Sequence, residues 1–238
     1  MSGTTPAGTS DERQAAAWVR GMFGRVAPRY DLLNHLLSFN IDRHWRNRTV
    51  RAVQSVLRRE SATIIDLCCG TGDLTIALQH KTSNRVYGSD FSHPMLQQAH
   101  KKSIPRLFEA DALNLPLRNK SADLLTVAFG FRNLANYEAG IREMKRVLRP
   151  GGMAAILEFS QPPNVVFAAM YSFYSRRVLP KIGALLSGAG DAYTYLPESV
   201  RKFPGPDELA GMMRSAGFAS VGYQRLTFGI VALHVAIV

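Results

Sequence analysis

From about residue 62, short apolar runs alternate with loops and helical patterns. The runs have the length and composition of β-strands: TIIDL, NRVYGS, RLFEA, DLLTVAF and MAAILEF. Each is followed by a loop and a segment of helical periodicity, such as NYEAGIREMKRVL. This alternation is typical of a doubly wound, mostly parallel sheet. Such α/β sheets bind ligands beyond the carboxyl ends of their strands.

The two ends of the chain depart from this alternation. Residues 221–238 contain two β-rich runs split at Phe228 and Gly229, which predicts an antiparallel pair completing the sheet. Two or three helices are expected before the first strand, with breaks at APRYD and FNIDRHW. We therefore expect a disordered lead, a helical region and a main domain, over residues 1–14, 15–60 and 61–238.

Size and composition limit the class of protein. A chain of 238 residues can form one sizeable α/β domain but is short for two. With 46% hydrophobic and 20% charged residues it is globular, and no apolar run approaches the ~18 to 20 residues that span a bilayer. The N-terminus does not resemble a signal peptide, so the expected compartment is the cytoplasm.

Positive charge is concentrated near the N-terminus. Between Arg13 and Arg59 there are ten arginines, no lysines and two acids, Asp31 and Asp42, which accounts for +8 of the net charge of +11. Such a region favours an anionic partner: nucleic acid, anionic lipid or an acidic substrate. A solvated basic helix face would have the same composition.

Cysteine and histidine spacing predicts neither a disulfide framework nor a metal site. Cys68 and Cys69 are adjacent, so a bridge between them would be strained. The histidines show no HxxxH or HExxH spacing, and neither cysteine belongs to a CxxC pair. We expect both cysteines to be small residues packed in a tight turn.

The stretch TIIDLCCGTGDLT, residues 63–75, joins the first strand to a helix. Gly70 and Gly72 would let backbone amides approach a ligand closely, although plain strand-to-helix turns also use glycine. Asp90 ends the second strand, where a carboxylate can accept both hydroxyls of a ribose. Asp111 and Ala112 end the third and could face an adenine. Together these positions predict a nucleotide-type site.

The choice of cofactor rests on the charge and glycine spacing of this turn. A dinucleotide fingerprint requires a third glycine where this chain has Thr75. Asp66 and Asp73 flank the turn, and their charge would repel a pyrophosphate but attract the sulfonium and amino groups of S-adenosylmethionine. The turn therefore predicts a methyl-donor site.

Six segments spread from about residue 20 to the end resemble the ubiquinone/menaquinone biosynthesis C-methyltransferase family. They are RYDLLNHLLSFNIDRHWR, DLCCGTGDLT, FGFRNLAN, RVLRPGGMAAILEFSQP, YSFYSRRVLPKIGALLSG and LTFGIVALH. The resemblance implies a class I S-adenosylmethionine-dependent methyltransferase fold: a seven-stranded sheet with an antiparallel C-terminal strand and an N-terminal helical lid. It also implies methylation of a ring carbon of a polyprenylated quinol, with S-adenosylhomocysteine as the second product and no metal.

Several functions are compatible with these motifs. Demethylmenaquinol is the favoured acceptor, and 2-methoxy-6-polyprenyl-1,4-benzoquinol is the alternative. A non-catalytic partner of a quinone biosynthesis complex could keep the same fold. A nucleic-acid methyltransferase is disfavoured, because AFGFRN stands where amino-group enzymes of that class carry an Asp/Asn-Pro-Pro-aromatic motif.

The resemblance assigns cofactor contacts to four of these positions: Thr71, Asp90, Asp111 and Ala112. With the residues of the turn and a lid residue, the full predicted set is Asp66, Gly70, Thr71, Gly72, Asp90, Asp111, Ala112 and Tyr30. Two positions depart from the family pattern. Ala128 replaces a frequent serine, which removes a hydroxyl contact, and Cys68 takes a place usually held by glycine or alanine.

The expected chemistry needs a reduced acceptor, since only a quinol donates electron density to its ring carbon. A base, or a cation that stabilises phenolate, is expected near the methyl group. Arg132 and Asn133, after the fourth strand, are the first candidates, and Tyr30, Tyr171 and Asp191 are weaker ones.

These candidates also have purely structural interpretations. Arg132 could pair with an acid such as Asp191, and Asn133 could cap the following helix, although Asn136 is better placed as that cap. Asp31 lies beside Tyr30 at a break in the N-terminal helices, where it is either part of the lid or a plain helix cap.

The segment VVFAAMYSFYSRRVLPKIGALL is apolar apart from Arg176, Arg177 and Lys181, which fits an interfacial helix as well as a core helix. It lies in a predicted helical insertion near 164–205 that would face the prenyl tail and a membrane. The basic N-terminal region would add attraction to anionic lipid. The expected location is therefore cytoplasmic with peripheral binding to the inner membrane face, and the sequence is compatible with a homodimer.

Overall fold

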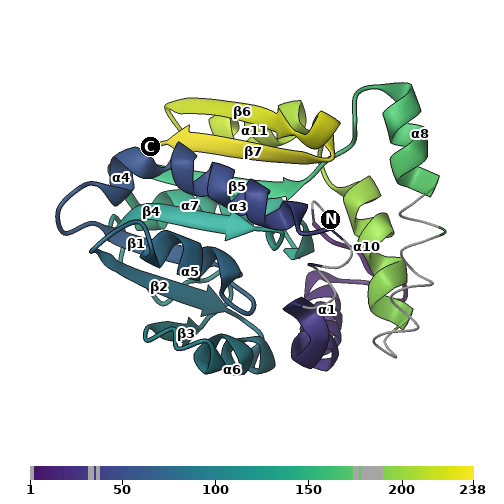
Figure 1. The fold of residues 1–238 in the computed structure, drawn as a ribbon, viewed down its shortest axis with the longest axis horizontal. Coiled ribbons are helices and arrows are strands. Elements are labelled where there is room, and N and C mark those ends of the chain that lie inside the picture. Colours follow the sequence, from purple (N-terminus) through teal and green to yellow (C-terminus); the bar gives the residue numbers. More distant parts are fainter. Residues whose placement is uncertain (1–2, 32–34, 36–37, 174–176, 178–189) are drawn as a thin grey trace.

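The computed structural model describes residues 3–31, 35, 38–173, 177 and 190–238 (Figure 1). A seven-stranded sheet has the order β3-β2-β1-β4-β5-β7-β6. Strands β1 to β5 pair in parallel, while β7 is antiparallel to both β5 and β6. The strands are β1 Thr63–Leu67, β2 Arg85–Asp90, β3 Leu107–Glu109, β4 Ala122–Ala128, β5 Leu148–Phe159, β6 Ser220–Leu226 and β7 Val231–Ile237. The predicted sheet class and its antiparallel end are confirmed.

Helices cover both faces of this sheet (Figure 1). Ile64 and Ile65 are successive buried residues of β1 that belong to different hydrophobic cores, because strand side chains alternate between faces. The core around Ile64 includes α3, α4 and α5, and the core around Ile65 includes α7 and α11. Burial on both faces explains why the central strands read as continuous apolar runs.

The helices follow the strands in the expected order. Their bounds are α1 Glu12–Val26, η1 Ala27–Arg29, α3 Ile41–Ala52, α4 Gln54–Leu57, α5 Asp73–Gln79, α6 His93–Lys101, η2 Phe131–Asn133, α7 Tyr137–Val147, α8 Val165–Phe173, α10 Gly190–Lys202, α11 Pro206–Ser215 and η4 Thr227–Gly229. The breaks expected at APRYD and FNIDRHW fall at η1 and at the start of α3, and η4 separates β6 from β7 at Phe228 and Gly229.

The N-terminal segment differs from the sequence prediction. Helix α1 begins at Glu12, inside the lead predicted to be disordered over 1–14, and Asp11 caps it by accepting a hydrogen bond from the Gln14 amide at 2.8 Å. Thr4 is buried, and its N–H donates to the Leu134 carbonyl at 2.8 Å. The disorder prediction is therefore wrong for these residues. Composition suggested a solvated segment, but tertiary contacts hold it against the loop after β4.

The predicted insertion near 164–205 contains α8 and α10, and part of it lies outside the described residues. Helix α8 projects from one end of the sheet (Figure 1). Among the described residues, no helix has the length and apolar character needed to cross a bilayer.

Candidate active site

The glycine turn links the buried end of β1 to the start of α5. Gly70 and Gly72 have φ angles of 57° and 88°, in the left-handed region that favours glycine. A Cβ atom on Gly72 would lie 2.0 Å from Cδ1 of Ile104, so a larger residue would also clash there. Cys68 has φ 51° despite its side chain, and both cysteines are free thiols.

Two buried carboxylates stand at the carboxyl ends of β1 and β2. Asp66 accepts hydrogen bonds from the hydroxyls of Thr75 and Thr126, each at 2.7 Å. Asp90 accepts from the backbone amides of Gly70 and Ser92, each at 2.9 Å, and so braces the glycine turn. Burial raises the pKa of each carboxyl to about 6. A bound cation would offset this cost of burying negative charge.

A cavity opens at the same edge of the sheet. Seven of the eight predicted cofactor residues line it: Tyr30, Asp66, Gly70, Thr71, Asp90, Asp111 and Ala112. Gly72 shapes the turn without lining the cavity. Ala128 and Cys68, the two departures from the family pattern, also lie in the wall. The carboxyl ends of the parallel strands bring all of these residues except Tyr30 together, as the sheet class predicted.

The N-terminal segment is bonded directly to the turn. The Thr71 hydroxyl donates a hydrogen bond to the Asp31 carboxylate, and Lys102 Nζ lies 2.6 Å from oxygens of both Asp31 and Asp73. Asp31 therefore contacts the turn, and it caps no described helix. Tyr30 lines the cavity and Asp31 is bonded to its glycine turn, while a lid role for the two residues stays a prediction.

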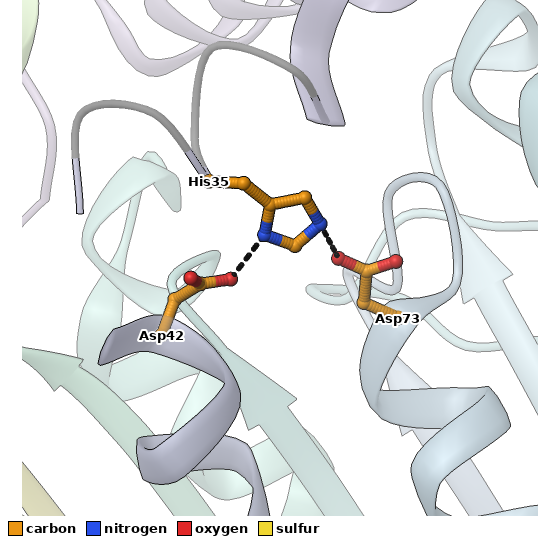
Figure 2. A group of neighbouring side chains, drawn as sticks. All are labelled: His35, Asp42 and Asp73. Atoms are coloured by element: carbon orange, nitrogen blue, oxygen red, sulfur yellow. Dashed lines mark hydrogen bonds and ion pairs between the residues drawn. The ribbon is translucent and has the colours of Figure 1, made fainter. Parts of the chain in front are cut away.

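Figure 2 shows a group of side chains that spacing analysis missed. His35 Nδ1 lies 2.8 Å from an oxygen of Asp42, and its Nε2 lies 3.6 Å from an oxygen of Asp73. The three side chains are close enough to share an ion, but Arg46 already pairs with both carboxylates and Lys102 with Asp73. The group is an ionic network that joins α3 to the turn, and we assign it no metal.

The Arg132 side chain is bonded to an acid on β5 that was not among the predicted site residues. It is 6% exposed, and its guanidinium donates to Oε1 of Glu158 at 2.9 Å and to the carbonyl of Phe129. Its ion-pair partner among the described residues is Glu158, at the end of β5, and the side chain of Asp191 lies outside the described residues. One signal could have identified Glu158, because it is an acidic residue near the end of the apolar run MAAILEF. Arg132 is not among the residues that line the cavity.

Asn133, in contrast, does line the cavity. Its Nδ2 donates to the Phe129 carbonyl at 3.4 Å, and its Oδ1 accepts from the phenol of Tyr195 at 3.0 Å. Asn136 caps α7 by accepting from the Ala139 amide at 2.9 Å, as predicted. Sequence reasoning missed Tyr195, since nothing in the pattern of α10 marks it.

Two further residues were predicted as weaker catalytic candidates. Tyr171 and Asp191 belong to α8 and α10, but their side chains lie outside the described residues. Their roles stay predictions.

Comparison with solved structures shows a methyltransferase fold. A possible histamine N-methyltransferase from Thermotoga maritima, described as S-adenosylmethionine-dependent, superposes with a TM-score of 0.64 at 18% identity, over 91% of this chain and 98% of that one. A phosphoethanolamine N-methyltransferase from Haemonchus contortus, in complex with S-adenosylmethionine, gives a TM-score of 0.60 at 11% identity, over 80% of this chain and 52% of that one.

Curated relatives are much closer in sequence. A demethylmenaquinone methyltransferase from Thermus thermophilus is 49% identical over 90% of this chain and 98% of its own length. Another from Deinococcus radiodurans is 45% identical over 94% of each chain. A ubiquinone/menaquinone biosynthesis C-methyltransferase from Syntrophotalea carbinolica is 45% identical over 90% of this chain and 92% of its own length. The profile of the ubiE/COQ5 methyltransferase family matches residues 9–238. The chain therefore belongs to the ubiE/COQ5 methyltransferase family and is an S-adenosylmethionine-dependent C-methyltransferase.

Proposed function

We propose that this methyltransferase transfers the methyl group of S-adenosylmethionine to a ring carbon of a polyprenylated quinol, with demethylmenaquinol as its preferred acceptor. The observation that carries the proposal is the 49% identity, across nearly the whole chain, to a relative named demethylmenaquinone methyltransferase. The Syntrophotalea relative has a name that covers both quinone types, so the benzoquinol is the second candidate.

The donor half of the site fits this reaction. Asp90 would accept hydrogen bonds from the two ribose hydroxyls, and Asp66 would lie near the cationic methionine end. Asp111 and Ala112 would face the adenine, beyond β3. Asp66 and Asp90 are buried and face the same cavity, and a cationic ligand stabilises their ionised forms.

The acceptor half would lie beside η2. As the ring carbon attacks the methyl group, negative charge grows on the quinol oxygen, and a hydrogen-bond donor placed there lowers the barrier. Asn133 lines the cavity and has such a donor in its amide. Arg132 does not line the cavity, so its positive charge would stabilise the quinol oxygen at longer range than Asn133 does. Its ion pair with Glu158 partly neutralises that charge.

We further propose that the protein docks on an anionic membrane surface through α8 and η4. On α8, Val165 is 80% exposed and Phe173 is 66% exposed, and Phe228 of η4 is 69% exposed. Phe167 and Phe228 stack with ring centroids 4.5 Å apart, so the two elements form one apolar patch. The chain also carries a net charge of +11, which attracts anionic headgroups. Such docking would bring the prenyl tail to the enzyme without exposing it to water.

Competition between acceptors tests the substrate assignment. The enzyme would be incubated with labelled S-adenosylmethionine and equal amounts of reduced demethylmenaquinol and reduced benzoquinol, and the products identified by mass. We expect mainly the methylated naphthoquinol. If methylated benzoquinol dominated the products, the benzoquinol would replace demethylmenaquinol as the preferred acceptor. If neither quinol were methylated, the proposed function would be overturned.

A further inference from the structure

A buried phenol lies directly behind the acceptor side of the cavity. Tyr195 of α10 is 6% exposed and does not line the cavity itself. Its hydroxyl donates to Oδ1 of Asn133 at 3.0 Å and lies 2.7 Å from the hydroxyl oxygen of Thr4. Trp18 of α1 packs on its ring, with centroids 5.0 Å apart. The side chain of Tyr195 thus joins Asn133 to Thr4 and to Trp18 of α1.

These contacts determine which way the Asn133 amide faces. In the orientation described, Oδ1 accepts from Tyr195 and Nδ2 donates to the Phe129 carbonyl at 3.4 Å. Reversing the amide would bring Oδ1 against the Phe129 carbonyl oxygen, and two acceptors facing each other repel. The same reversal would make the Tyr195 oxygen accept from Asn133. A phenol can make that bond too, so the Phe129 carbonyl selects the orientation, and Tyr195 holds the selected amide in place by donating to its Oδ1.

Protonation supports the same direction of bonding. Burial raises the pKa of the Tyr195 phenol, so it stays protonated and available as a donor at neutral pH. Because its single proton points to Asn133, the hydroxyl of Thr4 must donate to the phenol oxygen. The chain of bonds runs from Thr4 through Tyr195 to Asn133. It starts in the N-terminal segment and ends in the wall of the cavity.

We propose that Tyr195 is a positioning residue for methyl transfer, which holds the Asn133 amide so that an N–H group, and not its carbonyl oxygen, is presented to the acceptor. Nδ2 has two N–H groups, and within the described part of the chain it makes one hydrogen bond. The second N–H is available for the quinol oxygen, on which negative charge grows during the transfer. A rotated amide would place an oxygen there and raise the barrier. The inference rests on the proposed function.

A double-mutant cycle tests this coupling. Asn133→Ala should lower kcat for the quinol by about 10²-fold, the usual loss when one such donor is removed. Tyr195→Phe removes only the hydroxyl and should lower kcat by about tenfold, because the amide remains but is no longer fixed. The affinity for S-adenosylmethionine, measured by calorimetry, should stay within about twofold in both variants. The double variant should be no slower than Asn133→Ala alone, since Tyr195 acts only through Asn133.

Tyr137→Phe is the matched control. Tyr137 is also a buried phenol next to η2, but its hydroxyl donates to the backbone carbonyl of Arg132 at 3.0 Å and not to Asn133. Its effect on kcat should be small and should add to that of Asn133→Ala. Thr4→Val, which removes the donor to the phenol, provides a second variant if Tyr195→Phe does not fold. Thr4→Val should also lower kcat for the quinol, but it should have no effect on kcat when residue 133 is already alanine.

The outcomes separate this inference from the proposed function. If the wild type methylates the quinol but Tyr195→Phe and Asn133→Ala have additive effects, Tyr195 contributes through packing and the inference is overturned. An unchanged kcat in a folded Tyr195→Phe variant would also overturn the inference. If the wild type itself fails on every quinol, it is the proposed function that fails.

Discussion

Glu158 receives two hydrogen bonds from Arg132, one from its backbone amide at 3.1 Å and one from its guanidinium at 2.9 Å. Both side chains are almost fully buried, with 6% and 1% exposed. The contact ties η2 to the end of β5, so the loop that carries Asn133 is anchored to the sheet. Arg132 thereby links the stability of the fold to the geometry of the cavity wall at Asn133, where we propose that the acceptor binds.

Removing the Arg132 side chain should therefore affect stability as well as turnover. Arg132→Ala leaves a buried carboxylate unpaired, and breaking such a pair costs about 3 to 5 kcal/mol. Turnover should fall by about 10² to 10³-fold while donor affinity changes little, because the charge on the acceptor develops mainly in the transition state. Arg132→Lys should restore much of the stability but only part of the rate, since an ammonium cannot reproduce the guanidinium fork.

Chemical denaturation and single-turnover rates would be measured on both variants. Arg149→Ala is the control, because Arg149 forms a more exposed ion pair with Asp123 at 2.7 Å and its loss should cost about 1 kcal/mol or less. A folded Arg132→Ala enzyme within a few fold of the wild-type rate would make Arg132 a structural residue only.

Donor binding should depend strongly on Asp90. Asp90→Ala removes a carboxylate predicted to accept both ribose hydroxyls and also frees the Gly70 amide that it braces. Affinity for S-adenosylmethionine should fall at least tenfold, or about 1.4 kcal/mol, as expected when buried polar groups lose their partner. Calorimetry on the folded variant measures this, with Asp123→Ala as the control. Equal affinity for wild type and Asp90→Ala would remove Asp90 from the cofactor site.

The pH dependence of donor binding follows from the same carboxylates. Asp66 and Asp90 have folded-state pKa values of about 6, above the ordinary value of 3.8. The folded, donor-free protein therefore holds more protons than the unfolded chain between these values, and its stability should fall as pH rises through that window. Donor affinity should change in the opposite direction, because ionised Asp66 attracts the cationic end of the donor and ionised Asp90 is the better hydrogen-bond acceptor for the ribose hydroxyls.

Calorimetry at pH 5 and pH 7 should show affinity rising by about tenfold or more over this range. In Asp90→Asn the rise should be smaller, since one of the two groups no longer titrates. A wild-type affinity that is constant between these pH values would show that neither carboxylate changes its charge on donor binding.

Membrane docking is tested by a charge placed in the apolar patch. Phe228→Asp should reduce sedimentation with anionic vesicles, because it removes an exposed ring and adds a negative charge at η4. Gln97→Asp makes the same charge change on α6, beside β3 at the opposite edge of the sheet from β6 (Figure 1), and should have little effect. Neutral vesicles should bind the wild type more weakly. Equal binding by wild type and Phe228→Asp would exclude this patch as the docking surface.

The sheet was predictable because its signals are local. Strand β1 is buried on both faces and is apolar from Ile64 to Leu67 except at Asp66, and the glycine turn needs the φ values of Gly70 and Gly72. The position of Asp90 in the wall of the cavity was predictable from its place at the end of a strand, since parallel strands bring their carboxyl ends together.

The contacts that complete the site were not predictable from local pattern. Glu158 reaches Arg132 across 26 residues, Tyr195 reaches Asn133 across 62, and Thr4 reaches Tyr195 across 191. Such pairs depend on how separate elements pack, which hydrophobic periodicity does not encode. The disorder predicted for residues 1–14 was wrong for Thr4 and for Asp11 to Gln14 for the same reason.

The most direct test of the account is the chemical position of the transferred methyl group. S-adenosylmethionine carrying a ¹³C-labelled methyl would be mixed with reduced demethylmenaquinol, and in parallel with its oxidised quinone under strictly non-reducing conditions, and the products examined by NMR. The account predicts an aromatic C-methyl signal that grows with the quinol only. A methoxy signal, or equal labelling of the oxidised quinone, would contradict methyl transfer to a quinol ring carbon.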